Sequence, residues 1–249
     1  MTEHAAAHEH WDVSPWPMVI TIGILFLAPL AFAFQFVYHQ SLSSIICLGI
    51  GVPLVIMGIA GWISEAIGGN GSGLSVPAMG WFILAEAMIF VSFIASYWFM
   101  RLTASAWPPE GSVELPKMMP LVMTVILVTS SFTIHIAEAK MEQNNHAGFL
   151  KWLLITMILG ISFLGISVYE WTHLFHEGFN VTTNVFSTSF FTITGFHGAH
   201  VLVGLGIFMA ILVPALMGSI NHDFVKSGSL YWHFVDIIWF FVVSQVYYW

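Results

Sequence analysis

The chain has 249 residues, of which 58% are hydrophobic and only 7% charged, and its formal net charge is −8. Soluble domains carry roughly 25% charged residues, and a soluble chain of this length could not cover so much apolar surface, whereas a lipid bilayer covers it directly. The composition excludes an ordinary globular domain, and the acidic balance argues against a nucleic-acid partner. The single cysteine, Cys47, excludes an internal disulfide and a cysteine-ligated cluster.

Seven apolar stretches follow one another along the chain, each long enough to cross roughly 30 Å of hydrocarbon at about 1.5 Å per residue. They predict membrane-spanning helices at about 17–38, 42–64, 78–102, 118–138, 149–173, 187–214 and 229–249. The breaks between them have turn chemistry, such as the glycine-rich run 68–73 and Trp107-Pro108-Pro109. No alternation of polar and apolar residues is long enough for a membrane barrel, so the sequence predicts an all-α polytopic membrane protein.

The same breaks predict the domain organisation. We expect a polar N-terminal tail at 1–16, a two-helix transmembrane hairpin at 17–64, a Gly-rich loop at 65–77 and a five-helix transmembrane bundle at 78–249.

One acid lies well inside a predicted span. Glu86 is about eight residues into the third span, near one-third depth, within Leu84-Ala85-Glu86-Ala87-Met88. An ionised carboxylate there is costly unless it is paired, hydrated or protonated. Glu86 is therefore either a packing acid hydrogen-bonded to a neighbour or a protonatable group in a wet crevice or beside a partner.

Two polar clusters interrupt the last two spans. His197 and His200 are three residues apart and share a helix face, as do His233 and Asp236. With His135 of the fourth span, these histidines could form a metal site or supply axial haem ligands. The alternative, which we favour, is a structural polar network of interhelical hydrogen bonds, in which His233 and Asp236 pair or bridge to His197 or His200 and lock the seventh span to the sixth.

These clusters also carry a family resemblance. The segments Thr194-Gly195-Phe196-His197-Gly198-Ala199-His200 and Tyr231-Trp232-His233-Phe234-Val235-Asp236 stand in that order, after an acid at Glu86 and Tyr169-Glu170-Trp171 at the end of the fifth span. With them the chain resembles subunit III of the haem-copper (cytochrome c) oxidases from Ser14 to Trp249. The resemblance implies seven helices split two plus five by a V-shaped lipid cleft, and it adds Glu170 to the expected polar network.

The resemblance also implies a function. The chain is expected to be the non-redox, non-catalytic subunit III of a proton-pumping terminal oxidase that reduces dioxygen with electrons from cytochrome c. Haem and copper are expected in the partner subunits I and II, and neither cofactor nor metal in this chain. Subunit III stabilises subunit I, holds phospholipid, and supports proton uptake and dioxygen access, in which Glu86 is the proton-related acid.

Location and further partners follow from the same resemblance. We expect a multi-pass protein of a bacterial plasma (inner) membrane with a cytoplasmic N-terminus. Cytochrome c is expected to bind through the complex, and a respiratory supercomplex is a further expected partner. The positive-inside rule barely decides the orientation, because three lysines lie on one predicted side and one lysine and one arginine on the other.

The resemblance places four residues at the lipid cleft, namely Trp62, Glu65, His200 and Lys226. The family usually has an arginine beside the acid at Glu65, where it meets a lipid phosphate, and this chain has Ser64. A cleft without that arginine holds acyl chains with less selectivity for the head group.

Other functions stay open. Within the family, the electron donor could be quinol, or the chain could serve a nitric oxide reductase, although such accessory chains tend to lack the hairpin at 17–64. A membrane b-type cytochrome predicts a Soret band from the isolated chain. A transporter predicts symmetric helix breaks, and Pro29, Pro53 and Pro214 are not symmetrically placed.

Overall fold

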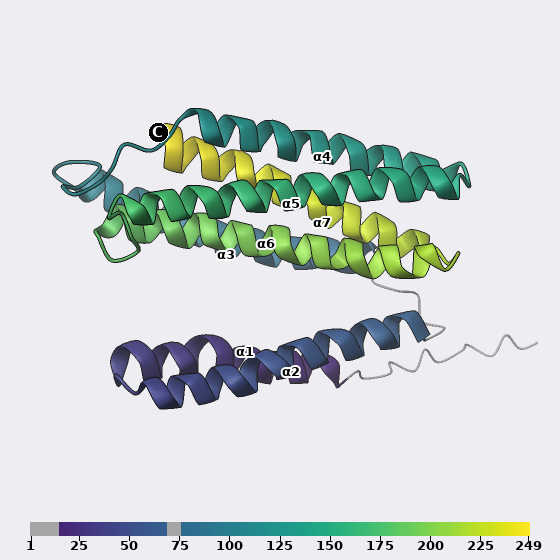
Figure 1. The fold of residues 1–249 in the computed structure, drawn as a ribbon, viewed down its shortest axis with the longest axis horizontal. Coiled ribbons are helices and arrows are strands. Elements are labelled where there is room, and N and C mark those ends of the chain that lie inside the picture. The colour runs from purple at the N-terminus through teal and green to yellow at the C-terminus, as the bar shows by residue number, and fades with distance from the viewer. Residues whose placement is uncertain (1–14, 69–75) are drawn as a thin grey trace, which may run out of the picture. The chain divides into compact units, whose positions relative to one another are not determined.

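The computed structural model describes the backbone of residues 15–68 and 76–249, with all side chains in these ranges except those of residues 28–29, 36–37, 62–68 and 77–78. The predicted polar tail and most of the predicted Gly-rich loop therefore lie outside the described residues. Every regular element in the described ranges is helical (Figure 1), which confirms the all-α prediction. The described residues fall into two compact units divided between Gly71 and Ser72.

Six helices are long and apolar enough to cross a membrane in the part of the chain that is described. They begin and end as follows: α2 (Ser41–Gly68), α3 (Val76–Thr103), α4 (Met118–Glu142), α5 (His146–His176), α6 (Val185–Leu216) and α7 (His222–Val243), which η3 (Ser244–Tyr248) extends.

The first predicted span, 17–38, is not one regular α-helix. It consists of α1 (Trp16–Leu25), which is too short to be a span by itself, and two π-helical segments, η1 (Phe26–Leu30) and η2 (Ala33–Val37). Pro29 lies in η1 and has no backbone N–H, so the i→i−4 hydrogen-bond pattern cannot pass through it unchanged. The helical path still runs over residues 16–37, in agreement with the predicted limits.

Several helices are longer than their apolar stretches because polar caps set where they begin. The side chain of Asn145 accepts a hydrogen bond from the backbone of Gly148 at the start of α5, and Asn221 accepts one from Phe224 at the start of α7. Asn184 and Ser187 form a reciprocal capping box at the start of α6. Each cap satisfies backbone N–H groups that have no partner within the helix, so hydrophobicity alone underestimates these lengths.

In the first unit, α1 and α2 form a helical hairpin that packs through small residues. A Cβ on Gly51 of α2 would lie 2.8 Å from the backbone oxygen of Gly23 in α1, so the two backbones approach as closely as glycine allows. Near the turn, the hydroxyl of Ser44 donates to the backbone oxygen of Ala31 at 2.9 Å.

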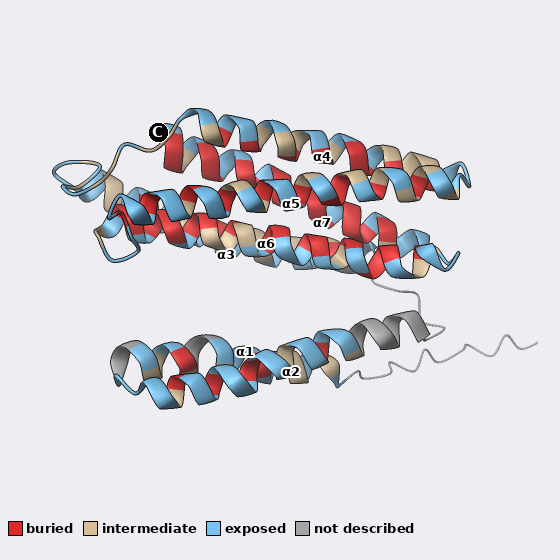
Figure 2. Cartoon of the chain, in the orientation of Figure 1, coloured by how far each residue is buried: buried red, intermediate tan, exposed pale blue. Residues whose placement is uncertain are grey.

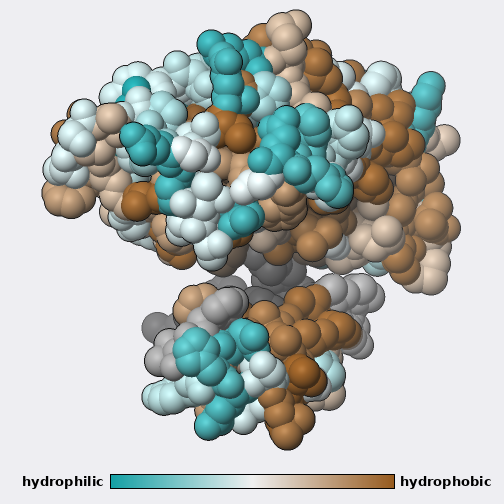
Figure 3. Space-filling model, turned by 60° about the vertical axis from the view of Figure 1, so that its left-hand side comes forward, coloured by the Kyte–Doolittle hydropathy of each residue, from teal (hydrophilic) through white to brown (hydrophobic). Residues whose placement is uncertain are grey.

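In the second unit, α7 is the central helix. Of its most apolar window, 61% is buried, against at most 44% for any other candidate span in the described residues, and its buried faces are visible behind α4 and α5 in Figure 2. It contacts α3, α4 and α6. Figure 3 shows hydrophilic side chains gathered at the end that carries the loops before α4 and α6, and hydrophobic ones along the helices.

Trp232 of α7 occupies a space that two glycines leave open. It is fully buried. A Cβ on Gly204 of α6 would lie 2.7 Å from Cε3 of the indole, and a Cβ on Gly160 of α5 would lie 2.7 Å from its Cη2. The indole Nε1 donates to the hydroxyl of Ser130 on α4 at 2.8 Å. One side chain therefore connects four helices.

Substitution of Gly204 tests this packing. In Gly204→Ala the new methyl group overlaps a rigid indole that cannot move aside, so we expect a loss of about 1–3 kcal/mol in stability, the usual cost of overpacking. Gly206→Ala is the matched control, because a Cβ on this glycine of the same helix meets nothing within 4 Å. Thermal unfolding of the purified protein in detergent measures both. Equal midpoints for the two variants would show that α6 and α7 are not closely packed here.

Candidate functional site

The acid at Glu86 is paired with a histidine of another helix. Its Oε2 lies 3.1 Å from Nε2 of His200, so the contact joins α3 to α6. The two side chains are 19% and 10% exposed, respectively. The other ring nitrogen of His200, Nδ1, lies 2.8 Å from the backbone oxygen of Phe196, one turn earlier in α6. Each ring nitrogen of His200 thus has one hydrogen-bond partner.

These contacts determine how many protons the pair holds. A carbonyl oxygen only accepts, so Nδ1 of His200 must carry a proton. One further proton is then needed between Nε2 and the carboxyl oxygen. Either a protonated Glu86 donates to a neutral His200, or a charged His200 donates to an ionised Glu86. Both arrangements are neutral overall, which is what a low-dielectric site favours.

Aromatic rings enclose this pair. The ring of Phe90, which is buried, lies 5.0 Å from that of His200, and the ring of Phe196 lies 4.6 Å from it. Tyr231 of α7 stacks on the imidazole at 6.4 Å, and its hydroxyl donates to the backbone oxygen of His200 at 3.4 Å. These rings keep the surroundings apolar, so the attraction within the pair is stronger than in water.

His197, the other histidine of this segment, lies in a different environment. Its ring is 5.0 Å from Trp239 and 5.6 Å from Phe163, and it is almost fully buried. Neither ring nitrogen has a hydrogen-bond partner among the described residues. In the same described residues, no three His, Cys, Asp or Glu side chains are grouped as metal ligands. His197 and His200 therefore have separate roles, and His197 fills an aromatic pocket.

The polar residues of α7 contact α4. Oγ of Ser131 donates to Oδ2 of Asp236 and lies 3.1 Å from Nδ1 of His233. The expected bridge from His233 or Asp236 to His197 or His200 is thus wrong, since the partner stands on α4 rather than α6. The physical reason is spacing: Trp232 and Tyr231 contact α6, and His233 and Asp236 share another face of α7, which turns toward α4.

Hydroxyl residues of α4 are further partners of α7 that the sequence does not predict. Besides Ser131, the helix supplies Ser130, which accepts from Trp232, and Thr124, whose hydroxyl accepts from the indole of Trp239 at 2.9 Å. No local signal identifies these partners, because Ser and Thr within a span also donate to a carbonyl of their own helix, as Thr124 and Ser130 do.

Glu170 has a partner at the end of the chain. The hydroxyl of Tyr247, in η3, donates to its Oε2 at 2.7 Å, and both side chains are buried. The second carboxyl oxygen of Glu170 has no hydrogen-bond partner in the described part of the chain. This contact joins the end of α5 to the end of α7.

Of the four residues expected at a lipid cleft, the structure describes the side chains of His200 and Lys226. Nζ of Lys226 lies 3.3 Å from Oε1 of Glu142 and so belongs to the α4–α7 junction, whereas His200 faces Glu86 of α3. Trp62 and Glu65 stand in the last turns of α2, and their side chains lie outside the described residues.

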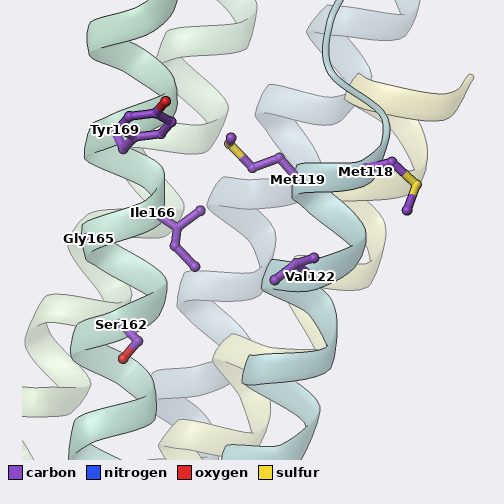
Figure 4. Close-up of a pocket in the computed structure, with 7 residues that line it drawn as sticks. All are labelled: Met118, Met119, Val122, Ser162, Gly165, Ile166 and Tyr169. Atoms are coloured by element: carbon purple, nitrogen blue, oxygen red, sulfur yellow. The ribbon is translucent and has the colours of Figure 1, made fainter.

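An apolar groove of about 530 Å³ lies between α4 and α5 (Figure 4). Its lining comes from two helices only: Met118, Met119, Val122, Ser162, Gly165, Ile166 and Tyr169. The groove offers little besides hydrocarbon contact, so it is suited to an apolar occupant and not to chemistry.

Comparison with known proteins decides the family. The family model described as Cytochrome c oxidase subunit III matches residues 7–249. The chain belongs to this family. Cytochrome c oxidase subunit 3 of Drosophila melanogaster is 31% identical over 255 residues, covering 96% of this chain and 95% of the relative. The same subunit of Aedes aegypti is 30% identical over 267 residues, covering 100% and 99%. That of a Synechocystis species is 39% identical over 170 residues, covering 67% and 72%.

Family membership identifies the complex to which this chain belongs. The chain is a multi-pass membrane subunit of the haem-copper cytochrome c oxidase, an oxidoreductase complex, and is not the catalytic subunit itself. Other oxidase subunits are its partners. The polar pairs described above therefore lie in a subunit that is not itself catalytic.

Removal of the Tyr247 hydroxyl tests the Glu170 contact. Tyr247→Phe leaves a buried carboxyl group without a donor, and an unsatisfied buried polar group costs about 1–3 kcal/mol. We expect a lower thermal midpoint of the assembled oxidase. Tyr169→Phe is the control, since Tyr169 is largely exposed and precedes Glu170 directly. Equal losses in the two variants would contradict a specific role of the Tyr247 hydroxyl.

Proposed function

We propose that this chain packs against subunit I of its oxidase, holds phospholipid, and supports proton uptake and dioxygen access for that subunit. In this proposal, electrons come from cytochrome c, haem and copper reside in subunits I and II, and the membrane is a bacterial plasma membrane. The proposed lipid site is the cleft implied by the resemblance, with Trp62, Glu65, His200 and Lys226 as its candidate residues. Dioxygen is apolar, so it concentrates in hydrocarbon beside the subunit that reduces it.

The observation that carries the proton role is the Glu86–His200 pair. Two titratable groups at membrane depth, 3.1 Å apart, hold one proton between them. Because both placements of this proton leave the pair neutral, its transfer across the hydrogen bond creates no net buried charge. Net transfer through the pair needs one proton to enter as another leaves, so that the pair stays neutral throughout. We propose this role for Glu86 in preference to a purely structural one.

Charge and relatives support the rest of the proposal. With a cytoplasmic N-terminus, Lys140, Lys151 and Lys226 lie on the cytoplasmic side, and Arg101 and Lys117 on the other, a small excess in the direction of the positive-inside rule. The helical hairpin of α1 and α2 supports a cytochrome c oxidase rather than an accessory chain that lacks it. The relatives are named as subunits of cytochrome c oxidase, which supports cytochrome c over quinol.

Replacement of Glu86 by glutamine tests the proton role. Glu86→Gln keeps the shape and can still donate to His200, but it cannot exchange a proton. We expect an assembled oxidase with slower proton uptake and turnover, by up to about tenfold if the pair lowers the barrier by about 1.4 kcal/mol, and with a shorter working lifetime.

A surface acid supplies the control for this variant. Glu177→Gln removes a carboxylate that makes only an exposed i,i+4 pair with His173 at 3.4 Å. It is expected to match the unmodified oxidase. If turnover, proton uptake and lifetime were all unchanged in Glu86→Gln, the proposed role of this acid would be wrong.

Purification of the tagged chain in mild detergent tests its place in the complex. We expect haem and copper to come down with large membrane partners, and the visible bands to leave with those partners when they are stripped away. A Soret band that stays with the stripped chain, or a chain that comes down alone, would contradict the proposal. The candidates for a cofactor or transport site would then be His135, His197, His200 and His233.

A further inference from the structure

A row of polar side chains follows the junction of α4 and α7. The residues on α4 are three or four positions apart, and those on α7 three or seven, so each set lies along one face of its helix. We define the α4–α7 stripe by the following residues: Ser131, His135, Glu138 and Glu142 of α4, and Lys226, His233 and Asp236 of α7.

Residues of the stripe make contacts at three levels, from the end of the helices inward. At the end, Lys226 pairs with Glu142 at 3.3 Å. Further in, Nδ1 of His135 lies 3.9 Å from Oε2 of Glu138. At the inner end, Ser131 contacts both His233 and Asp236. These three sets of contacts follow one another along the surface where α4 and α7 run antiparallel.

The stripe reaches the middle of the membrane. His135 lies seven residues before the end of α4 at Glu142, which is about 10 Å at about 1.5 Å per residue. Ser131 lies eleven residues before that end, and His233 lies eleven residues after the start of α7 at His222, which is about 16 Å in each case. Ser131 is thus near the middle of the 25-residue α4, and His233 is near the middle of the 27-residue candidate span His222–Tyr248.

Part of the stripe faces outward. The His135 side chain is 76% exposed, and Ser131 and His233 are partly exposed. Phe132 and Ile237 beside them are exposed as well, as expected of a surface within hydrocarbon. Acyl chains offer no hydrogen bonds, so an imidazole facing lipid at this depth is costly. The Glu86–His200 pair avoids this cost by facing inward, and the stripe does not.

We propose that a membrane-spanning helix of another oxidase subunit packs on the α4–α7 stripe and presents hydrogen-bond donors to His135 and His233. The proposal rests on the place of this chain in the oxidase complex. Inward of Lys226, the stripe holds two acids, two histidines and a serine but no Lys or Arg. Donor side chains such as Arg, Asn, Trp, Ser or Thr on the partner complement this set.

Two other occupants fit the stripe less well. A second copy related by a two-fold axis places Glu138 and Asp236 near their own counterparts, so like groups meet. A phospholipid brings its polar groups only to the membrane surface, far from His233. A polar helix can offer hydrogen-bond partners along the whole length of the stripe.

Photocrosslinking in the intact oxidase tests the proposal. A photoreactive phenylalanine analogue replaces His135 in one variant and Leu154 in the control. Leu154 is 42% exposed and lies eight residues after the start of α5 at His146, so it stands at nearly the same depth on another helix. We expect irradiation to join position 135, but not position 154, to a different oxidase subunit.

The crosslinking outcomes separate this proposal from the proposed function. Adducts of position 135 with lipid, with the chain itself or with a second copy would overturn the stripe as a docking face, while copurification with haem would leave the proposed function standing. A chain that does not copurify with haem at all would overturn both.

A second measurement uses one substitution for which the two possible occupants predict opposite effects on retention. If lipid covers the stripe, His135→Leu removes a poorly solvated group and retention of the chain in the oxidase stays equal or improves. If a polar helix covers it, a hydrogen bond is lost and we expect retention during detergent washing to fall about fivefold, which corresponds to about 1 kcal/mol. Phe132→Leu, on the adjacent exposed position, is the control and keeps the apolar character of the face. Unchanged or improved retention of His135→Leu would overturn the proposal.

Discussion

The indole of Trp232 is the constraint on which the five-helix unit depends. It fills the space beside Gly160 and Gly204, and its Nε1 donates to Ser130, so a single ring connects α4, α5 and α6 to α7. In lipid the hydrophobic effect does not drive helices together, and close packing and interhelical hydrogen bonds must supply the association. Trp232 provides both in one side chain. The rotation that it imposes on α7 decides which neighbours the other polar residues of that helix meet.

The polar groups of the unit follow from this arrangement. Tyr231, beside the indole, faces His200 and completes the aromatic surroundings of the Glu86 pair. His233 and Asp236 turn instead to Ser131 of α4. Each buried acid for which the structure gives a partner meets a hydroxyl group or an imidazole rather than a Lys or Arg, in a medium that penalises charge. One carboxyl oxygen of Glu170 and one of Asp236 have no hydrogen-bond partner in the described residues.

A membrane subunit of this kind is complete only within its complex. The Glu86–His200 pair is satisfied inside the chain, whereas the α4–α7 stripe leaves imidazole groups at mid-membrane depth on the surface. The first kind of group finds its hydrogen-bond partner within the chain itself. The second kind needs a partner, since hydrocarbon cannot solvate it. Inward polar groups thus have partners within the chain, whereas outward polar groups indicate a surface that another subunit covers.

The amino-acid sequence by itself determined the class of the protein, because spans of about twenty apolar residues have few alternatives in water or lipid. It also determined the family, through the motifs at Thr194–His200 and Tyr231–Asp236. It predicted the path of the first span but not its π-helical segments, and it underestimated the helices that begin at asparagine caps. Only the tertiary structure decided which polar residues meet. Residue spacing places His233 and Asp236 on one face of a helix but does not say toward which neighbour that face turns. That choice is made by the packing of Trp232 against glycines from two other helices, a contact between distant residues that no local pattern encodes.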